Sequence, residues 1–229
     1  MNYAIVTAGG VGSRVNANCP KQFLTINDKP LIVYTLEKFQ ESSLIDEIVV
    51  PCLEGWQDKI KEYVIDYKLD KVKAIVMGGS SGQQSIYNGY MAIKDRCDDN
   101  TIILIHDGNR PNVSQLLIKD GIELCKKKGN AIAYIPCQEV VFLTNDFASS
   151  NKLIERKEIA RTQTPHVFNK KTLEEAFDFA KKYGYNEEPA ICSLLQKLGM
   201  TCYLYKGDEK NLKITFSSDL DIFKALIGM

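Results

Sequence analysis

Hydrophobic residues fall into short apolar runs that alternate with longer stretches of helical spacing. The apolar runs predict strands at 3–6, 45–50, 72–77, 101–105 and 131–135. The amphipathic stretches predict helices at 31–39, 56–67, 83–94 and 116–127. Because this alternation is typical of parallel strands joined by crossover helices, we predict an α/β fold. We expect a Rossmann-like, mostly parallel sheet with helices on both faces.

The alternation stops after Pro136. Residues 140–144 and 152–158 resemble two short strands joined by a polar turn, with no helix between them. We therefore predict an antiparallel hairpin arm at about 137–160. Later elements are predicted as helices at 171–183 and 189–198, a strand at 201–205, and a final helix that Ser217 or Ser218 caps and that ends near Leu226. Without repeats or linkers, the chain reads as a single domain, 1–229.

Composition limits the partners and the compartment. Hydrophobic residues make up 45% of the chain, enough for a full core, and Lys+Arg and Asp+Glu are equal at 29 each. A balanced charge argues against broad binding to nucleic acid or to a membrane surface, and no apolar run approaches the ~20 residues of a membrane span. The chain enters its first strand without a leader-like segment. Seven cysteines without a CxxC pair favour reduced thiols over disulfides or zinc, so we expect a cytoplasmic protein.

The first predicted strand leads into a glycine-rich stretch, Thr7-Ala8-Gly9-Gly10-Val11-Gly12-Ser13-Arg14, which Pro20-Lys21-Gln22 follows. Glycines let backbone N–H groups converge without interference from a Cβ atom, and converging N–H groups bind anions. Arg14 and Lys21 add two cations that suit a triphosphate. We predict that this loop binds a nucleoside triphosphate for phosphoryl chemistry. The simplest alternative is a tight turn with two surface cations.

Two better-known nucleotide loops fit this stretch poorly. A Walker motif requires Gly-Lys-Ser/Thr after the glycines, and this is absent. A dinucleotide fingerprint requires a third glycine where Val15 stands.

Two further polar stretches follow predicted strands. Gly78–Gly82 comes after the strand at 72–77, and Asp107 comes just after the strand at 101–105. Because the carboxyl ends of parallel strands lie at one edge of the sheet, where ligands bind, we expect all three stretches to meet.

Five segments of the chain, in order, resemble those of the cytidylyltransferases that act on sugar-alcohol phosphates, a family that includes the methylerythritol-phosphate and ribitol-phosphate enzymes. The resemblance covers essentially the whole chain. The segments are Ala8-Gly9-Gly10-x-Gly12-x-Arg14 with Pro20-Lys21-Gln22-Phe23, Gly78-Gly79 with Ser85-Ile86, His106-Asp107-x-x-Arg110-Pro111, Gln163-Thr164-Pro165-His166-x-Phe168, and Asn211-Leu212-Lys213-Ile214-Thr215 with Asp219-Leu220.

The resemblance implies that an alditol phosphate attacks the α-phosphorus of CTP and that pyrophosphate leaves. It implies that Arg14, Lys21 and Lys213 are catalytic, and that Arg110, Arg156, Thr164 and Lys213 bind the acceptor. It also implies a homodimer, because the family's arginine at the position of Arg156 lies on the arm and reaches the neighbouring subunit's site.

The nucleotide contacts implied by the resemblance come from the first loop, the second glycine stretch and one carboxylate. They are Ala8, Gly9, Gly10, Val11, Gly12, Gly79, Ser80, Ser85 and Asp107. Small hydroxyls and backbone groups can read a pyrimidine at Gly79, Ser80 and Ser85. Asp107 is the expected Mg²⁺ contact, since magnesium takes few protein ligands.

Taken singly, several of these residues have simpler interpretations. Asp107 is at a position where turn or capping aspartates are common, and Lys213 and Arg156 would ordinarily be solvated. His106 reads as a packed, hydrogen-bonded histidine and not as a base, because an attacking phosphate is already ionised.

The chain departs from the family pattern mainly on the acceptor side. Gly82 stands where an arginine is usual, Pro189-Ala190 where Thr-Asp is usual, and Val15-Asn16 where Met-Gly is usual. The identity of the acceptor therefore stays open: ribitol phosphate, methylerythritol phosphate and a glycerol-type phosphate are all candidates. The sequence slightly favours the branch of the family that makes polymer precursors. The rivals from other classes are a nucleotide-binding protein without turnover and, less favoured, a dinucleotide-dependent oxidoreductase.

Overall fold

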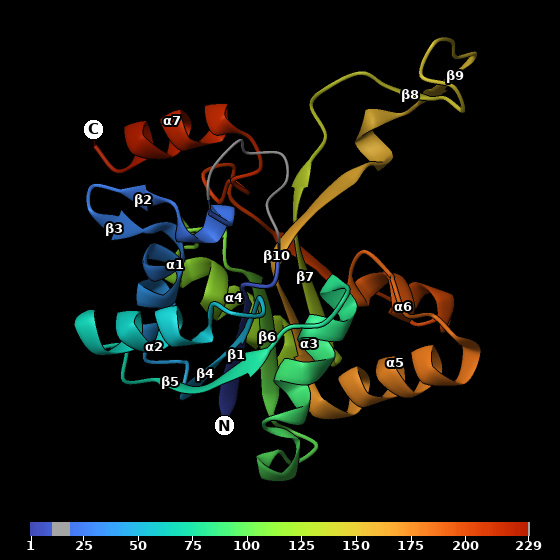
Figure 1. Cartoon of the computed structure of the whole chain (residues 1–229). Helices are drawn as coiled ribbons and strands as arrows, with labels where there is room; N and C mark the ends of the chain where they lie inside the picture. The colour runs from blue at the N-terminus through green and yellow to red at the C-terminus, as the bar shows by residue number, and fades with distance from the viewer. Residues whose placement is uncertain (11–18, 229) are drawn as a thin grey trace.

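A seven-stranded sheet forms the centre of the fold, in the order β11-β7-β10-β6-β1-β4-β5 (Figure 1). The computed structural model describes residues 1–10 and 19–228. All neighbouring strands are parallel except β10, which runs antiparallel to both β6 and β7. The strands are β1 (Asn2–Thr7), β4 (Glu47–Cys52), β5 (Val72–Met77), β6 (Ile102–Asp107), β7 (Asn130–Pro136), β10 (Ala160–Asn169) and β11 (Leu204–Lys206). The predicted mostly parallel α/β sheet is confirmed.

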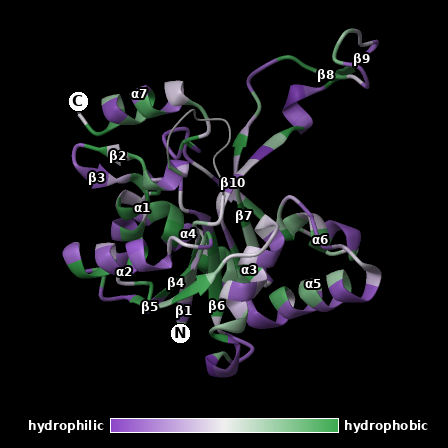
Figure 2. Cartoon of the chain, in the orientation of Figure 1, coloured by the Kyte–Doolittle hydropathy of each residue, from purple (hydrophilic) through white to green (hydrophobic). Residues whose placement is uncertain are grey.

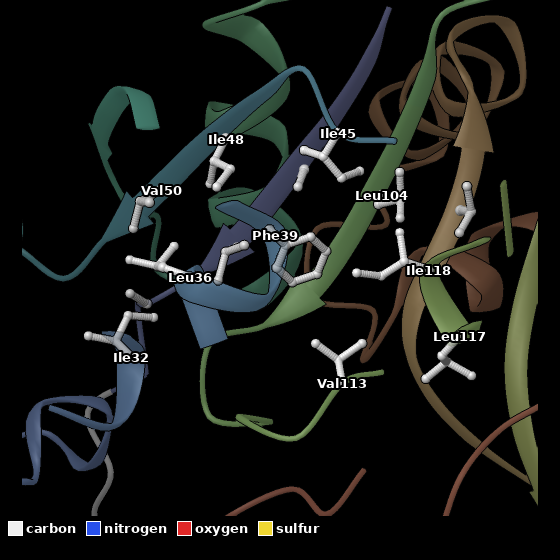
Figure 3. Close-up of a cluster of buried hydrophobic side chains, with 14 of the residues drawn as sticks. Ile32, Leu36, Phe39, Ile45, Ile48, Val50, Leu104, Val113, Leu117 and Ile118 are labelled. Atoms are coloured by element: carbon white, nitrogen blue, oxygen red, sulfur yellow. The ribbon is translucent and has the colours of Figure 1, made fainter. Parts of the chain in front are cut away.

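Helices cover both faces of this sheet, as predicted. One face carries α1 (Leu31–Gln40), α2 (Gln57–Asp66) and α4 (Gln115–Lys128), and the other carries α3 (Gly82–Met91), α5 (Lys170–Tyr183) and α6 (Ile191–Lys197). Figure 3 shows the first of the two cores, in which Phe39 of α1 lies near Ile118 of α4. Hydrophobic residues are concentrated on the central strands, and the outer helix surfaces are largely hydrophilic (Figure 2).

A small third layer lies beside α1. The short strands β2 (Thr25–Ile26) and β3 (Lys29–Pro30) form a hairpin that packs, through Ile26, on α7 (Ser217–Leu226) near Phe223. This hairpin was not predicted. Its turn residues, Asn27 and Asp28, both have positive φ, and both are residue types that tolerate this conformation.

The strand β10 was also missing from the sequence prediction, although it lies between β6 and β7. Pro165 argues against an interior strand because proline donates no ladder hydrogen bond. The structure accommodates it at an irregularity, where the pairing of β10 with β7 shifts between Gln163 and His166. The polar half of the strand, 160–164, lies beyond its apolar, buried half.

The predicted arm leaves the sheet between β7 and β10 and projects away from it (Figure 1). It contains β8 (Val141–Leu143) paired antiparallel with β9 (Lys152–Ile154). The prediction of a strand over 152–158 was too long, because Arg156–Glu158 forms a 3-10 turn. Phe142, Phe147 and Leu153 are exposed on the arm.

Polar side chains cap two of the helices. The side chain of Ser81 accepts a hydrogen bond from the Gln84 N–H and caps α3. The predicted serine cap of α7 is wrong: Ser217 is already helical, and the carboxylate of Asp219 accepts from the backbone N–H groups of Thr215 and Phe216. In the described part of the chain, every helix is too short or too polar to span a membrane.

Candidate active site

Two adjoining pockets lie at the carboxyl edge of the parallel strands. The first, of about 320 Å³, is here called the glycine pocket and is lined by Thr7, Gly9, Gly10, Lys21, Gln22, Gly79, Ser80, Ser81, Gly82, Ser85, Asp107, Asn109 and Lys213. The second, of about 300 Å³, is called the histidine pocket and is lined by Thr7, Gly82, Ile86, Ile105, Asp107, Arg110, Thr162, Gln163, Thr164, His166, Pro189, Ala190, Ile191 and Lys213. Thr7, Gly82, Asp107 and Lys213 line both, so the pockets share a wall.

The glycine pocket brings together most of the predicted nucleotide contacts. Gly9, Gly10, Lys21, Gly79, Ser80, Ser85 and Asp107 all line it. Val11, Gly12 and Arg14 lie outside the described residues. Ala8 is different: its side chain is buried and its N–H donates to the Pro51 carbonyl, so it ends β1 and does not line the pocket.

Gln22 fixes the start of the glycine loop. Its buried amide nitrogen donates to the carbonyls of Ala8, at 2.8 Å, and Gly10, at 2.9 Å. These bonds tie the first turn of the loop to Gln22, which itself lines the glycine pocket. The sequence placed Gln22 in the motif next to Lys21 but gave it no role.

The turn between β5 and α3 is built around Gly79. Its N–H donates to Ser85 Oγ at 2.9 Å, and this hydroxyl in turn donates to the Ser81 carbonyl. A Cβ atom on Gly79 would lie 2.1 Å from Gln84 Cγ, so the turn requires glycine. Ser85 thus organises the turn, and its contact with a base stays a prediction.

Asp107, at the end of β6, lies at the centre of the shared wall. Its Oδ2 atom is 3.0 Å from Arg110 Nε and 3.1 Å from Lys213 Nζ. Burial alone would raise the pKa of Asp107, but the Lys213 and Arg110 charges outweigh it and hold that pKa below its usual range. The carboxylate is therefore ionised at neutral pH. The backbone N–H of Asp107 donates to Thr164 Oγ1 at 3.1 Å. Thr164, a predicted acceptor contact, therefore also helps to position Asp107.

Arg110 has more internal contacts than the sequence suggested. Besides Asp107, its guanidinium contacts the Asn211 carbonyl at 2.8 Å, and the residue is buried. It lines the histidine pocket, where its contact with an acceptor stays a prediction.

Lys213 is carried by a loop that buried amide side chains fix in place. Asn109 pairs with Ile214, since the Asn109 amide donates to the Ile214 carbonyl and the Ile214 N–H donates to the Asn109 carbonyl. Gln163 donates to the Asp208 carbonyl, and Asn211 to the Thr164 carbonyl. These three residues, which we call the amide platform, had no predicted role because each bond joins segments far apart in the sequence.

The two histidines are both buried and differ in their surroundings. His106 Nε2 lies 3.0 Å from the Arg110 carbonyl, and its ring packs near Phe39, which confirms the predicted packed histidine. His166 lines the histidine pocket. Burial lowers the pKa of each imidazole to about 4, so both are neutral near pH 7.

Arg156 is the one described acceptor residue that the structure does not bring to the pockets. It lies on the arm, where its guanidinium donates to the Gln138 carbonyl at 3.0 Å. Arg156 lines neither pocket, and the arm that carries it projects away from the sheet (Figure 1).

The acceptor-side departures meet in space. Gly82 and the pair Pro189-Ala190 are more than a hundred positions apart in the chain, yet both line the histidine pocket. Pro189 and Ala190 line only the histidine pocket, whereas Gly82 lines the glycine pocket as well and belongs to the shared wall.

Comparison with known proteins agrees with this geometry. Residues 2–228 match the family model of 2-C-methyl-D-erythritol 4-phosphate cytidylyltransferase (IspD). The chain is 38% identical to a ribitol-5-phosphate cytidylyltransferase of Lacticaseibacillus paracasei, over 98% of this chain and 97% of the relative. It is 39% identical to a ribitol-5-phosphate cytidylyltransferase of Vibrio parahaemolyticus, over 99% of this chain and 96% of the relative. It is 38% identical to a 2-C-methyl-D-erythritol 4-phosphate cytidylyltransferase of Clostridium acetobutylicum, over 99% and 97%.

The fold has solved counterparts as well. The crystal structure of 2-C-methyl-D-erythritol 4-phosphate cytidylyltransferase from Francisella tularensis matches 98% of each chain with a TM-score of 0.83 and 27% identity. That from Thermus thermophilus matches 100% of this chain and 98% of its own, with a TM-score of 0.78 and 25% identity. With a full-length family match and relatives near 38% identity, the chain belongs to the IspD family of sugar-alcohol-phosphate cytidylyltransferases.

Proposed function

We propose that this chain transfers CMP from CTP to the phosphate of an alditol phosphate, ribitol 5-phosphate or a similar polymer precursor, and releases pyrophosphate. The observation that carries the proposal is the shared wall: two pockets of similar size meet at Asp107 and Lys213. A reaction between two anionic substrates needs such a junction, with cations between them. The two relatives named for ribitol 5-phosphate support this acceptor.

In this mechanism the CTP phosphates lie in the glycine pocket against Gly9, Gly10 and Lys21. An oxygen of the acceptor phosphate attacks the α-phosphorus, and the bond from that phosphorus to the bridging oxygen of pyrophosphate breaks. Lys21 and Lys213 offset the negative charge that develops on the transferring group, and Arg14, outside the described residues, is the expected third cation. The attacking phosphate is already ionised, so no residue has to remove a proton.

Lys213 changes partners in this scheme. Its ammonium group pairs with Asp107, although its side chain is 45% exposed. An incoming phosphate offers it a second anion at the junction. Because Arg110 keeps Asp107 paired, Lys213 can turn toward the phosphate without leaving a buried carboxylate uncompensated.

The cytosine base is assigned to the turn at Gly79, Ser80 and Ser85. The turn has no room for a side chain at Gly79, and its polar groups are small. These features suit the amine and carbonyl of a pyrimidine better than the larger purine ring system.

Mg²⁺ is the proposed cofactor, with Asp107 as its protein ligand. The described residues contain no cluster of three or more metal-binding side chains. One carboxylate is nonetheless sufficient, since Mg²⁺ usually keeps waters and binds substrate phosphates. Arg110 and Lys213 both contact Asp107 through Oδ2, and neither of these ion pairs uses Oδ1. When bound, the ion would neutralise charge on the triphosphate.

The arm is proposed to form a homodimer and to deliver Arg156 to the partner's histidine pocket. Exposed apolar side chains on the arm, including Phe142 and Phe147, support an interface, and Arg156 lines neither pocket of its own chain. The cytoplasm is the expected compartment, in keeping with seven free thiols.

A second candidate acceptor is 2-C-methyl-D-erythritol 4-phosphate. The family model carries that name, and the Clostridium acetobutylicum relative is as similar as the ribitol 5-phosphate enzymes. The reaction would be the same, with a branched polyol in the histidine pocket.

The test is pyrophosphate release from CTP and Mg²⁺ with ribitol 5-phosphate, 2-C-methyl-D-erythritol 4-phosphate and glycerol 3-phosphate as separate acceptors. We expect the highest kcat/KM with ribitol 5-phosphate. Preference for the methylerythritol phosphate would select the second candidate. CTP binding without release with any acceptor would favour a non-catalytic nucleotide-binding protein.

A further inference from the structure

The segment 185–190, here called the acceptor loop, has few backbone hydrogen bonds of its own. It lies between α5 and α6 and brings Pro189 and Ala190 to the histidine pocket. Among the described residues, only the two ends of this loop pair with other main-chain groups. The Tyr185 N–H donates to a carbonyl of α5, and the Ala190 carbonyl accepts from an N–H of α6. The middle of the loop therefore depends on side chains for its position.

Two side chains from the start of α3 supply these bonds. The buried amide of Gln83 spans the loop, since Nε2 donates to the Tyr185 carbonyl at 2.6 Å and Oε1 accepts from the Glu188 N–H at 2.9 Å. The Ser81 hydroxyl donates to the Asn186 carbonyl at 3.0 Å. These bonds join segments 102 to 105 positions apart in the chain. They hold the acceptor loop against the turn that lines the glycine pocket.

An ion pair at the surface is a weaker anchor of the same loop. Lys197 of α6 lies 2.6 Å from the Glu188 carboxylate and 4.1 Å from the centre of the Tyr185 ring. The Lys197 side chain is 41% exposed, and ion pairs this exposed contribute little. Gln83 is the main anchor, because its buried amide makes two bonds whose loss would leave two backbone groups unpaired.

The nucleotide side of the site does not depend on Gln83. Its side chain lines neither pocket. The turn before α3 keeps the bond from the Gly79 N–H to the Ser85 hydroxyl and the Ser81 cap. Lys213 is held by the amide platform. Loss of the Gln83 amide would therefore loosen the acceptor loop alone.

We infer that Gln83 is a positioning residue for the acceptor, because its amide holds the acceptor loop in place as one wall of the histidine pocket. The inference rests on the proposed function, which places the acceptor in this pocket. Pro189 and Ala190, the departures that line this pocket alone, are set in place by the same amide. A loosened wall has to be ordered again when the acceptor binds, so the acceptor binds less tightly while CTP is spared.

The first test is steady-state pyrophosphate release by Gln83→Met, which keeps the length of the side chain and removes both hydrogen bonds. We expect the KM for the preferred polyol phosphate to rise about tenfold, and the KM for CTP and kcat to stay within about twofold. Gln196→Met is the matched control. It removes an exposed amide on α6 that donates to the Met200 carbonyl and lines neither pocket, and it should behave as wild type. An equal rise in both KM values, or a fall in kcat alone, would overturn the inference.

The second test measures the loop directly and needs no substrate. Glu187 is exposed on the acceptor loop, and Glu155 is exposed on the arm. In limited proteolysis with a glutamyl endopeptidase, Gln83→Met should be cut after Glu187 about tenfold faster than wild type, because the loosened loop opens more often. Cleavage after Glu155 is the internal control and should keep its rate. Mass spectrometry of the fragments identifies each cut, and an unchanged rate after Glu187 would overturn the inference.

The two readouts separate the inference from the proposed function. Faster cleavage after Glu187 with an unchanged acceptor KM would overturn the inference and leave the proposed function standing. No pyrophosphate release by the wild type with any polyol phosphate would overturn the proposed function, and the inference with it.

A second variant covers the case in which Gln83→Met fails to fold, as thermal unfolding would reveal. Gln83→Asn stays polar, but its amide is one methylene shorter and cannot reach both backbone groups. Its acceptor KM should rise at least about threefold with the KM for CTP unchanged. A wild-type acceptor KM in this variant would overturn the inference.

Discussion

At the scale of single residues, the chemistry depends on how Asp107 is held. Arg110 is fixed by the Asn211 carbonyl, whereas Lys213 is half exposed. One of the two cations on the carboxylate is thus structural and the other can move. This difference could not be read from the sequence, where both residues are simply basic.

Replacing Lys213 tests this assignment. Lys213→Ala should lower kcat by about 100- to 1000-fold, the effect of losing one preorganised transition-state contact. Stability should change little, because Arg110 still pairs with Asp107. Lys210→Ala is the matched control on the same loop, since Lys210 is exposed and lines neither pocket. Steady-state pyrophosphate release measures both, and equal losses in the two variants would contradict the role of Lys213.

The buried histidines make stability depend on pH. The pKa values of His106 and His166 are about 4 in the folded chain and ordinarily about 6.5 when unfolded. Below pH 6.5 the two imidazoles bind protons in the unfolded chain but stay neutral in the folded chain. The free energy of unfolding therefore falls as the pH is lowered toward 4. At pH 5 we expect a loss of about 2 kcal/mol for each histidine.

Urea unfolding at pH 7.5 and pH 5.0 measures this loss. In His166→Gln, which keeps only His106, the fall in the free energy of unfolding between the two pH values should be about half as large. An unchanged fall in the variant would show that His166 does not cause it.

At the scale of elements, the turn before α3 is the most constrained part of the site. A Cβ atom on Gly79 would lie 2.1 Å from the Gln84 side chain and 2.9 Å from the Gln84 backbone, while one on Gly82 would meet nothing within 4 Å. Gly79→Ala should therefore lower the free energy of unfolding by about 1–3 kcal/mol and raise the KM for CTP. Gly82→Ala should keep the stability within about 0.5 kcal/mol. Thermal unfolding of both variants decides, and equal destabilisation would contradict the steric explanation.

Sequence patterns located most elements because strands and helices with regular apolar spacing carry local signals. The three loops at the carboxyl edge followed from that alternation and meet at the pockets as expected. The strand β10 could not be predicted, since Pro165 and a polar first half conceal it. The amide platform was not predicted for another reason. Asn109, Gln163 and Asn211 act through tertiary hydrogen bonds that no local sequence pattern encodes.

At the scale of the whole molecule, each active site of the proposed dimer contains residues from both chains. If Arg156 acts in the partner's site, inactive Arg156→Ala and Lys213→Ala variants should complement each other when mixed. Half of the randomly formed dimers are mixed, and one of the two sites in each has both residues intact, so about one quarter of wild-type activity should return.

Pyrophosphate release after co-refolding or co-expression of the two variants measures this recovery. Mixing either variant with itself is the control. If the mixture sediments as dimers but recovers no activity, Arg156 does not act in the partner's site.

The position of β10 has a consequence for synthesis on the ribosome. Ile105 and His166 pair across the sheet although 61 positions separate them (166 − 105). Until β10 has emerged, β6 and β7 lack the strand that joins them, and each presents an unpaired backbone edge. Because β11 also follows the arm, β7 then lacks both of its partners, and the nascent chain carries three open edges, one on β6 and two on β7, while the whole arm is being made. A chain arrested near residue 136 would retain these open edges, which are prone to pair with other chains.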